Sequence, residues 1–122
     1  MTIIGIHHVN LLVDDLDAAR HFYGDVFGFT ELARPDFGFP GAWYQMGAQQ
    51  LHLQTTAGPE KKSAQHFALQ VDDCSAMADS LEAKGVEMFR LDAVDGAGRQ
   101  AFCNDPAGNL IELNEPIAAH VP

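Results

Sequence analysis

The stretch His66–Asp73, with the sequence HFALQVDD, repeats the pattern of His8–Asp15, HVNLLVDD, in the first half of the chain. Each copy begins with a histidine, alternates apolar and polar residues, and ends in a pair of aspartates. Such alternation predicts a half-buried strand, and aspartates are typical N-cap residues of a helix that follows. We therefore expect one structural unit that is used twice.

Each half continues with the same succession of elements. In the first half the sequence predicts a strand over 3–13, a helix that ends at Gly28, and strands at 29–34, 42–46 and 50–55. In the second half it predicts a strand over 64–71, a helix over 73–84, and strands at 86–91, 100–104 and 109–114. A polar connector, 56–63, joins the halves. We expect an α+β fold of two βαβββ repeats, about 3–55 and 64–114, in one domain that spans 1–122.

The composition limits the partners of the chain. It has 122 residues, with 7 lysines and arginines against 17 aspartates and glutamates, and a formal net charge of −10. An excess of negative charge repels phosphate backbones and anionic lipid, so we expect neither nucleic acid nor a membrane as a partner. Because the sequence has no apolar run of about 18 residues and no basic leader, we expect a cytoplasmic protein with its two cysteines, Cys74 and Cys103, reduced.

The repeat also relates four side chains that can bind a metal ion. His8 corresponds to His66, and His52, between two leucines, corresponds to Glu112, between an isoleucine and a leucine. Because successive strand side chains alternate between faces, all four point away from the side that packs on the helices. In a pseudo-twofold pairing of the halves, these two symmetric pairs converge on one point. Imidazole and carboxylate ligands suit Zn, Ni, Co, Mn or Fe(II) better than Mg or Ca.

Four further residues are candidates for contacts with a substrate. They are Arg34, Phe39 and Trp43 in the first half and Arg99 in the second. Arg34 precedes an aromatic loop, where it can meet a substrate carboxylate beside Phe39 and Trp43. The alternative is that Arg34 pairs with a surface acid and the aromatic residues belong to the core. Arg99, after a glycine-rich segment, is a similar candidate.

The metal hypothesis depends on the repeat. Each histidine taken singly is explained more simply as a residue on the solvated face of an antiparallel sheet.

Several motifs of the chain together resemble one known family. They are Ile6-His7-His8-Val9, Val13-Asp14-Asp15-Leu16, His21-Phe22-Tyr23, Gly28-Phe29, His66 and the run from Asp105 to Glu112. From about Ile6 to Leu113 the chain resembles the vicinal oxygen chelate superfamily, the glyoxalase, bleomycin resistance protein and extradiol dioxygenase group. The resemblance implies a cleft-shaped mixed sheet with helices on its outer face, a homodimer, and one divalent metal ion held at His8, His52, His66 and Glu112. In the glyoxalases the second position is commonly Glu or Gln.

The resemblance leaves three activities open. It implies a metal-dependent isomerase or lyase of the glyoxalase type, in which a small substrate chelates the metal through neighbouring oxygens and Glu112 moves a proton. The alternatives are an Fe(II) extradiol-type dioxygenase and a bleomycin-resistance-like protein that binds a small molecule without turnover. Phe102 stands where the dioxygenases have a tyrosine. Leu12 and Thr56 stand where glutathione-type glyoxalases have an arginine and an asparagine, so glutathione is not favoured as the thiol.

Overall fold

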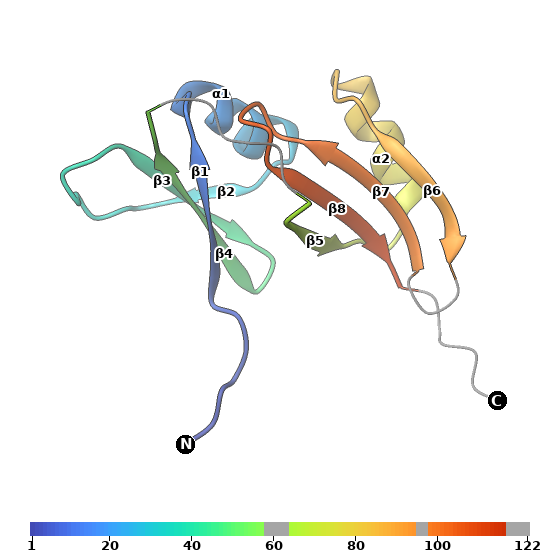
Figure 1. Ribbon diagram of the computed structural model, residues 1–122, viewed down its shortest axis with the longest axis horizontal. Helices are drawn as coiled ribbons and strands as arrows, with labels where there is room; N and C mark the ends of the chain where they lie inside the picture. The colour runs from blue at the N-terminus through green and yellow to red at the C-terminus, as the bar shows by residue number, and fades with distance from the viewer. Residues whose placement is uncertain (58–63, 95–97, 117–122) are drawn as a thin grey trace. The chain divides into compact units, whose positions relative to one another are not determined.

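The computed structural model describes residues 1–57, 64–94 and 98–116, which divide between two compact units, Met1–Lys61 and Lys62–Pro122 (Figure 1). Each unit has the order strand, helix and three strands, so the predicted α+β class and the βαβββ repeat are confirmed. Most of the predicted connector, at 58–63, lies outside the described residues, as does most of the glycine-rich segment, at 95–97.

The first unit is a mixed four-stranded sheet with the strand order β1-β4-β3-β2. β1 (His8–Val13) runs parallel to β4 (Gln49–Thr55), and β3 (Gly41–Met46) lies antiparallel between β4 and β2 (Thr30–Leu32). α1 (Leu16–Arg20) contacts β3 and β4. It begins as predicted, because the carboxylate of the N-cap Asp15 accepts a hydrogen bond from the backbone N–H of Ala18 at 3.0 Å.

The helical segment of the first unit differs from the prediction in its second half. The apolar spacing predicts one continuous helix up to Gly28, but η1 (His21–Val26), which follows α1, is a π-helix. Its backbone passes close to β3, and a Cβ on Gly24 would lie 3.5 Å from the ring of Tyr44. The spacing of apolar residues did not reveal the change, because both kinds of helix bury one face.

The first strand is shorter than predicted. It begins at His8 rather than Ile3, because its neighbour β4 begins at Gln49 and the last bond on that side joins the backbone N–H of Gln50 to the carbonyl of His7 at 3.0 Å. The apolar side chains of Ile3, Ile4 and Ile6 are exposed. The sequence pattern that predicted the strand therefore extends to residues before His8, where β1 has no partner strand within the described residues.

The second unit repeats the topology, with the strand order β5-β8-β7-β6. β5 (His66–Gln70) runs parallel to β8 (Leu110–Glu115), and β7 (Gly98–Asn104) lies antiparallel between β8 and β6 (Phe89–Val94). α2 (Cys74–Ala83) contacts β7 and β8, and Asp73 is its N-cap, as predicted. No helix within the described residues has the length and apolarity needed to cross a membrane.

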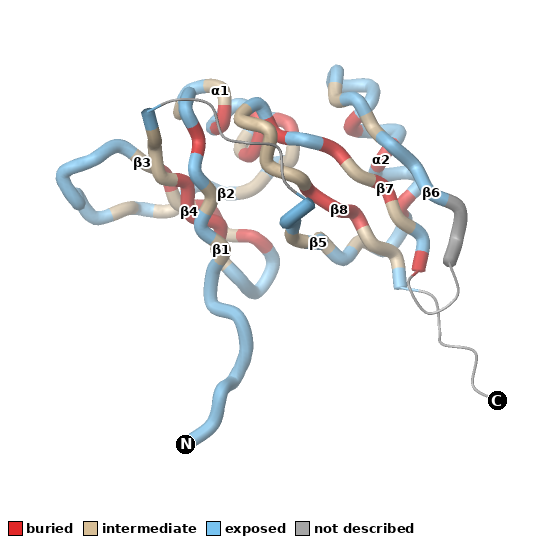
Figure 2. Tube along the Cα trace, in the orientation of Figure 1, coloured by how far each residue is buried: buried red, intermediate tan, exposed pale blue. Residues whose placement is uncertain are grey.

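The central strands β4 and β8 each carry three consecutive buried residues (Figure 2). Leu51 and Leu53 on β4 belong to the apolar core, as do Ile111 and Leu113 on β8 and the two free cysteines. The middle residue of each triplet is polar and points to the opposite face, because strand side chains alternate. His52 and Glu112 are therefore buried on the side of the sheet that the core does not occupy, with exposed fractions of 8% and 6%.

Candidate metal and substrate site

Burial singles out two of the predicted ligands. Among the described residues, the buried polar side chains are His52, Asp105 and Glu112. Asp105 is explained by the turn before β8, because its Oδ1 accepts hydrogen bonds from the backbone N–H groups of Ala107 and Asn109 at 2.9 and 2.8 Å. The other two occupy equivalent positions on β4 and β8, and a buried polar side chain needs partners of its own.

In the second unit, Glu112 and His66 form an ordered pair. Glu112 Oε1 lies 3.1 Å from His66 Nε2. Its Oε2 accepts hydrogen bonds from the side-chain amides of Gln100 at 3.1 Å and Asn114 at 2.8 Å. The two amides hold the carboxylate so that its free oxygen faces the imidazole. Phe102 packs edge-on against His66, with ring centroids 5.9 Å apart.

The hydrogen bond of the second ring nitrogen of His66 determines which form of Nε2 faces Glu112. His66 Nδ1 donates a hydrogen bond to the carbonyl oxygen of Ala64 at 2.9 Å. A neutral imidazole with its proton on Nδ1 presents a lone pair at Nε2, opposite a carboxylate oxygen that presents lone pairs as well. Two acceptors at this distance need a proton or a metal ion between them. A histidine whose second nitrogen donates to a backbone carbonyl is also the usual arrangement of a metal ligand.

In the first unit, His52 is stacked between two rings. Its imidazole lies 4.1 Å from the ring of His8, at an interplanar angle of 17°, and 4.1 Å from the ring of Trp43, at 7°. His52 Nε2 donates to Gln50 Oε1 at 2.9 Å. Burial lowers the pKa of His52, and the nearby histidines and Arg34 lower it further. A lowered pKa favours the neutral imidazole, which is the form that coordinates metal ions.

His8 lies at the exposed start of β1, next to a second histidine. The Nδ1 atoms of His7 and His8 are 3.0 Å apart. Strand alternation would turn His7 toward the helix side, yet it is exposed because β1 begins only at His8. The repeat does not point to His7, since the corresponding residue of the second half is Gln65, and sequence reasoning therefore missed this neighbour of the predicted ligand.

The predicted ligands thus fall into two pairs, one in each unit: His8 with His52, and His66 with Glu112. In the ranges that the structure describes, no group of three histidine, cysteine, aspartate or glutamate side chains is placed to hold a metal ion. The set of four ligands stays a prediction. Its donor chemistry fits a transition metal, because three imidazoles and a carboxylate are the ligands such ions prefer.

The substrate contacts predicted in the first unit form one cluster. The guanidinium Cζ of Arg34 lies 4.9 and 5.0 Å from the ring centroids of Phe37 and Phe39, and Nη1 donates to the carbonyl oxygen of Phe39 at 3.1 Å. Phe37 also packs on Trp43, with ring centroids 5.9 Å apart. These four residues line a pocket of about 160 Å³ together with Asn10, His52, Leu53 and Gln54. The aromatic loop therefore borders a pocket that includes a predicted metal ligand.

Arg99, the remaining predicted contact, lies on the other side of its sheet. Its Nε is 3.6 Å from Glu115 Oε2, and Glu115 Oε1 accepts a hydrogen bond from the backbone N–H of Cys74 at the start of α2. Alternation along β7 separates Arg99 from Gln100, the residue that reaches Glu112. A role for Arg99 in substrate binding stays a prediction, and the structure does not bring it to Glu112.

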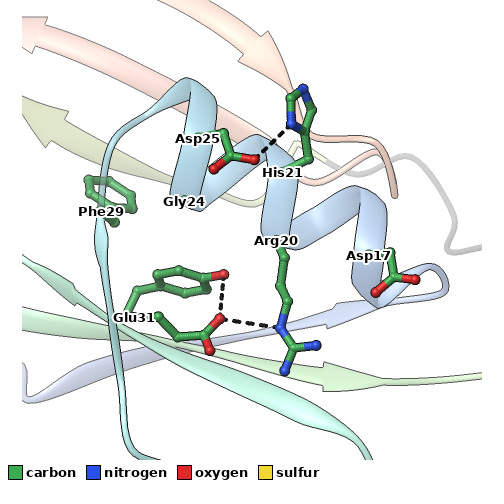
Figure 3. A pocket seen from close by; sticks show the side chains of 8 residues that line it. Asp17, Arg20, His21, Gly24, Asp25, Phe29 and Glu31 are labelled. Atoms are coloured by element: carbon green, nitrogen blue, oxygen red, sulfur yellow. Dashed lines mark hydrogen bonds and ion pairs between the residues drawn. The ribbon is translucent and has the colours of Figure 1, made fainter.

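A separate hollow of about 380 Å³ lies between the helical segment and the sheet of the first unit (Figure 3). Glu31 Oε1 accepts hydrogen bonds there from the Tyr44 hydroxyl at 3.0 Å and from Arg20 Nε at 3.2 Å. His21 Nδ1 lies 3.0 Å from Asp25 Oδ2, one helical turn away. In this hollow Arg20 pairs with Glu31 and His21 with Asp25. None of the predicted ligands is among its described lining residues.

Tyr44 gives the hollow a property that depends on pH. Burial, followed by the hydrogen bond to Glu31, raises the pKa of Tyr44 from 10.0 to about 12. Because the folded-state pKa lies above the unfolded value, stabilisation by the neutral hydroxyl is complete below pH 10.0 and is lost as the pH rises through about 12. We expect the difference in free energy of unfolding between the wild type and Tyr44→Phe, measured by urea denaturation, to fall across this range. A constant difference would contradict the assignment.

Comparison with known proteins finds clear relatives. A family model described as the Glyoxalase/Bleomycin resistance protein/Dioxygenase superfamily matches residues 5–113. The Arabidopsis thaliana protein named Glyoxylase I 4 is 30% identical over 119 residues, which cover 88% of this chain and 68% of that protein. The lactoylglutathione lyase of Haemophilus influenzae is 32% identical over 123 residues, which cover 90% and 91%. A solved structure described as a glyoxalase family protein from Bacillus anthracis has a TM-score of 0.86 at 26% identity, covering 96% of this chain and 98% of that chain.

Proposed function

Because the chain belongs to the glyoxalase, bleomycin resistance protein and dioxygenase superfamily, we propose that it is a divalent-metal-dependent enzyme of the glyoxalase type. Its substrate is a small molecule with two neighbouring oxygen atoms. The observation that supports this most directly is the pair of Glu112 and His66, in which a carboxylate oxygen and an imidazole nitrogen face one another at 3.1 Å. The relatives named lactoylglutathione lyase and Glyoxylase I 4 support the same class of reaction.

We propose that His8, His52, His66 and Glu112 hold one ion of Zn, Ni, Co, Mn or Fe. The support is the donor set, the lowered pKa of His52, and the equivalent places of the two pairs in the repeated units. A bound ion supplies Lewis-acid stabilisation of negative charge that develops on the substrate oxygens. Gln100 and Asn114 keep the carboxylate of Glu112 in place through hydrogen bonds to Oε2.

In this proposal Glu112 also moves the proton. A carboxylate that is buried and held by two amides is suited to accept a proton from a carbon beside a carbonyl group. Because Oε2 accepts both amide hydrogen bonds, Oε1 would serve both as ligand and as base, so Glu112 would have to leave the ion transiently to take the proton. Arg34, Phe39 and Trp43 are the proposed contacts with the rest of the substrate, and they border the pocket that includes His52.

Glu112→Gln tests the role of the carboxylate. We expect the rate of substrate proton exchange, measured by NMR in deuterated water, to fall about 100- to 10,000-fold, since general acid–base catalysis contributes about that factor. The amide oxygen still offers a ligand, so we expect metal content, measured by elemental analysis, to be largely retained. Glu87→Gln, at an exposed glutamate, is the matched control and should leave both quantities unchanged. Unchanged turnover in Glu112→Gln would remove Glu112 as the base.

A panel of assays tests the reaction class. Hemithioacetals of 2-oxoaldehydes, catechols, and pairs of a thiol and an epoxide would each be supplied with several divalent ions. We expect isomerisation of a hemithioacetal-like substrate and no ring cleavage of catechols. Phe102 supports the second expectation, because its ring, which carries no hydroxyl, packs against His66 where the dioxygenases have a tyrosine. Cleavage of a catechol with Fe(II) would instead favour the dioxygenase.

A binding protein without turnover is the second candidate. The exposed rings of Phe37 and Phe39, 52% and 41% accessible, favour it, because solvent-facing aromatic side chains are suited to bind a flat ligand. Metal content separates the two candidates. About one equivalent of a transition metal per chain, in protein purified without a histidine tag, supports the enzyme, whereas metal-free protein that binds an aromatic drug supports the binder.

We also propose that the chain forms a homodimer. The exposed apolar side chains of Ile3, Ile4 and Ile6 support this, because an extended segment with such side chains is suited to pack on a second copy. Light scattering should then give twice the chain mass of 13.3 kDa. A mass of one chain at micromolar concentration would count against the dimer.

A further inference from the structure

Arg34 differs from the other arginines of this acidic chain. Arg20, Arg90 and Arg99 each lie close to a carboxylate, with shortest distances of 3.2, 2.7 and 3.6 Å. Among the described residues, Arg34 pairs with no carboxylate. Asp36, the acid nearest to it in the sequence, accepts a hydrogen bond from the backbone N–H of Gly38 at 2.9 Å instead. Although the chain has a net charge of −10, no carboxylate of the described ranges lies beside this arginine.

The guanidinium of Arg34 is nevertheless fixed in position. The rings of Phe37 and Phe39 lie against it, and Nη1 donates to the carbonyl oxygen of Phe39. Gly41 lies directly beside it, because a Cβ on Gly41 would be 2.9 Å from both Cζ and Nε of Arg34. The first residue of β3 therefore has to be small for the guanidinium to occupy this place.

Most hydrogen-bond donors of Arg34 are unused. Nε is buried and has no hydrogen-bond partner among the residues that the structure describes. The bond from Nη1 to Phe39 is the one hydrogen bond of this guanidinium in the described part of the chain, out of five N–H donors. A buried donor without an acceptor costs free energy, and an anion placed beside it removes that cost. Phe37 and Phe39 cover the guanidinium but are themselves half exposed, so a rotation of either ring opens the way to it.

We propose that Arg34 binds a carboxylate, and that the substrate of this site is a small monocarboxylate whose apolar portion packs on Phe37 and Trp43. Arg34 lines the same pocket as His52, a proposed metal ligand. The assignment of this carboxylate site to the substrate therefore rests on the proposed function. The planar guanidinium matches the two oxygens of a carboxylate, which accept two parallel hydrogen bonds. The carboxylate is the end of the substrate that lies away from the reacting oxygens.

The size and charge of the pocket further restrict the chemical class of the substrate. Its volume of about 160 Å³ is well below the roughly 300–1,000 Å³ of pockets that enclose a whole drug-sized ligand, so it holds one end of a substrate. Neither lysine nor a second arginine is among its lining residues. A doubly charged phosphate or phosphonate would remain half neutralised beside a single guanidinium, which favours a singly charged carboxylate.

Isothermal titration calorimetry with three probes of similar shape tests the proposal. The full chain, as purified and after removal of metal by a chelator, would be titrated with benzoate, benzamide and phenylphosphonate. We expect benzoate to bind about 10- to 100-fold more tightly than neutral benzamide, since a hydrogen bond to a charged group typically contributes that factor. We also expect phenylphosphonate to bind no more tightly than benzoate. Equal affinity for benzoate and benzamide, or tighter binding of the phosphonate, would overturn the proposal.

Three variants assign the preference to Arg34. Arg34→Gln should abolish the difference between benzoate and benzamide, and Arg34→Lys should keep part of it, because lysine retains the charge without the planar pair of donors. Arg20→Gln, a change of the same kind at an arginine outside the pocket, should keep the full preference. A preference that survives in Arg34→Gln would show that benzoate binds elsewhere, for example on the metal ion.

Metal content distinguishes a failure of this inference from a failure of the proposed function. We expect Arg34→Gln to retain the metal of the wild type. If the wild type binds no metal but prefers benzoate through Arg34, the metal-dependent function is wrong and the carboxylate site stands. If the wild type binds metal and shows no preference for benzoate, the carboxylate site is wrong and the metal-dependent function stands.

Discussion

His66→Ala should weaken metal binding by more than about 100-fold. Loss of a group that merely orients a ligand already costs about 10- to 100-fold in metal affinity, and this substitution removes the ligand itself. It also leaves the carboxylate of Glu112, which is 6% exposed, without its partner at 3.1 Å. Metal content of purified protein, and competition with a chelator of known affinity, measure the loss.

The matched control for this prediction is His21→Ala. His21 is exposed, lies 3.0 Å from Asp25, and lines a hollow whose described lining residues include none of the proposed ligands. We expect it to retain the metal of the wild type. Equal metal content in His66→Ala and the wild type would show that the ion is held elsewhere, and metal loss in both variants would indicate an unspecific effect of histidine removal.

Gly98→Ala should be strongly destabilising. Gly98 has a φ of +86°, a conformation that residues with a side chain rarely adopt, and an added Cβ would collide with the backbone carbonyl oxygen of Glu115. The new carbon would also lie 3.0 Å from Oδ1 of Asn114, whose amide holds Glu112. We expect the free energy of unfolding, measured by urea denaturation, to fall by about 2–5 kcal/mol from backbone strain and overpacking together.

Gly85→Ala separates these two causes. Gly85 has a similar φ of +90°, but a Cβ there would meet no atom of the described residues within 4 Å. It should therefore show the conformational cost alone, about 1–2 kcal/mol. An equal loss of stability in the two variants would mean that β7 and β8 separate to admit the methyl group without cost, contrary to the close packing of these strands.

The sequence was sufficient to predict the repeated unit because the repeat carries both local signals and symmetry. Asp15 and Asp73 stand immediately before an apolar helical face in both copies, and both are N-caps. The π-helical turn at His21–Val26 was missed because a π-helix buries one apolar face as an α-helix does, so the spacing of apolar residues does not distinguish the two. The extra length predicted for the first strand has a different cause, since strand ends are set by the partner strand.

The candidate site was predictable in part for the same reason. Symmetry and strand alternation point to His8, His52, His66 and Glu112, because these depend on spacing alone. Gln100 was not predicted, since an isolated glutamine has no distinguishing pattern and only the register of β7 on β8 brings it to Glu112. The stacking of Trp43 on His52 likewise follows from the register of β3 on β4, in which the two residues are direct neighbours.

Because of this stacking, the tryptophan fluorescence of the protein is sensitive to the state of His52. Trp43 is the single tryptophan of the chain, so its tryptophan fluorescence arises from one indole in contact with the imidazole of His52. Protonation of an adjacent imidazole, or occupation of its lone pair, changes how strongly the indole emission is quenched. Events at this one side chain can therefore be followed in the unlabelled protein, in real time and at low concentration.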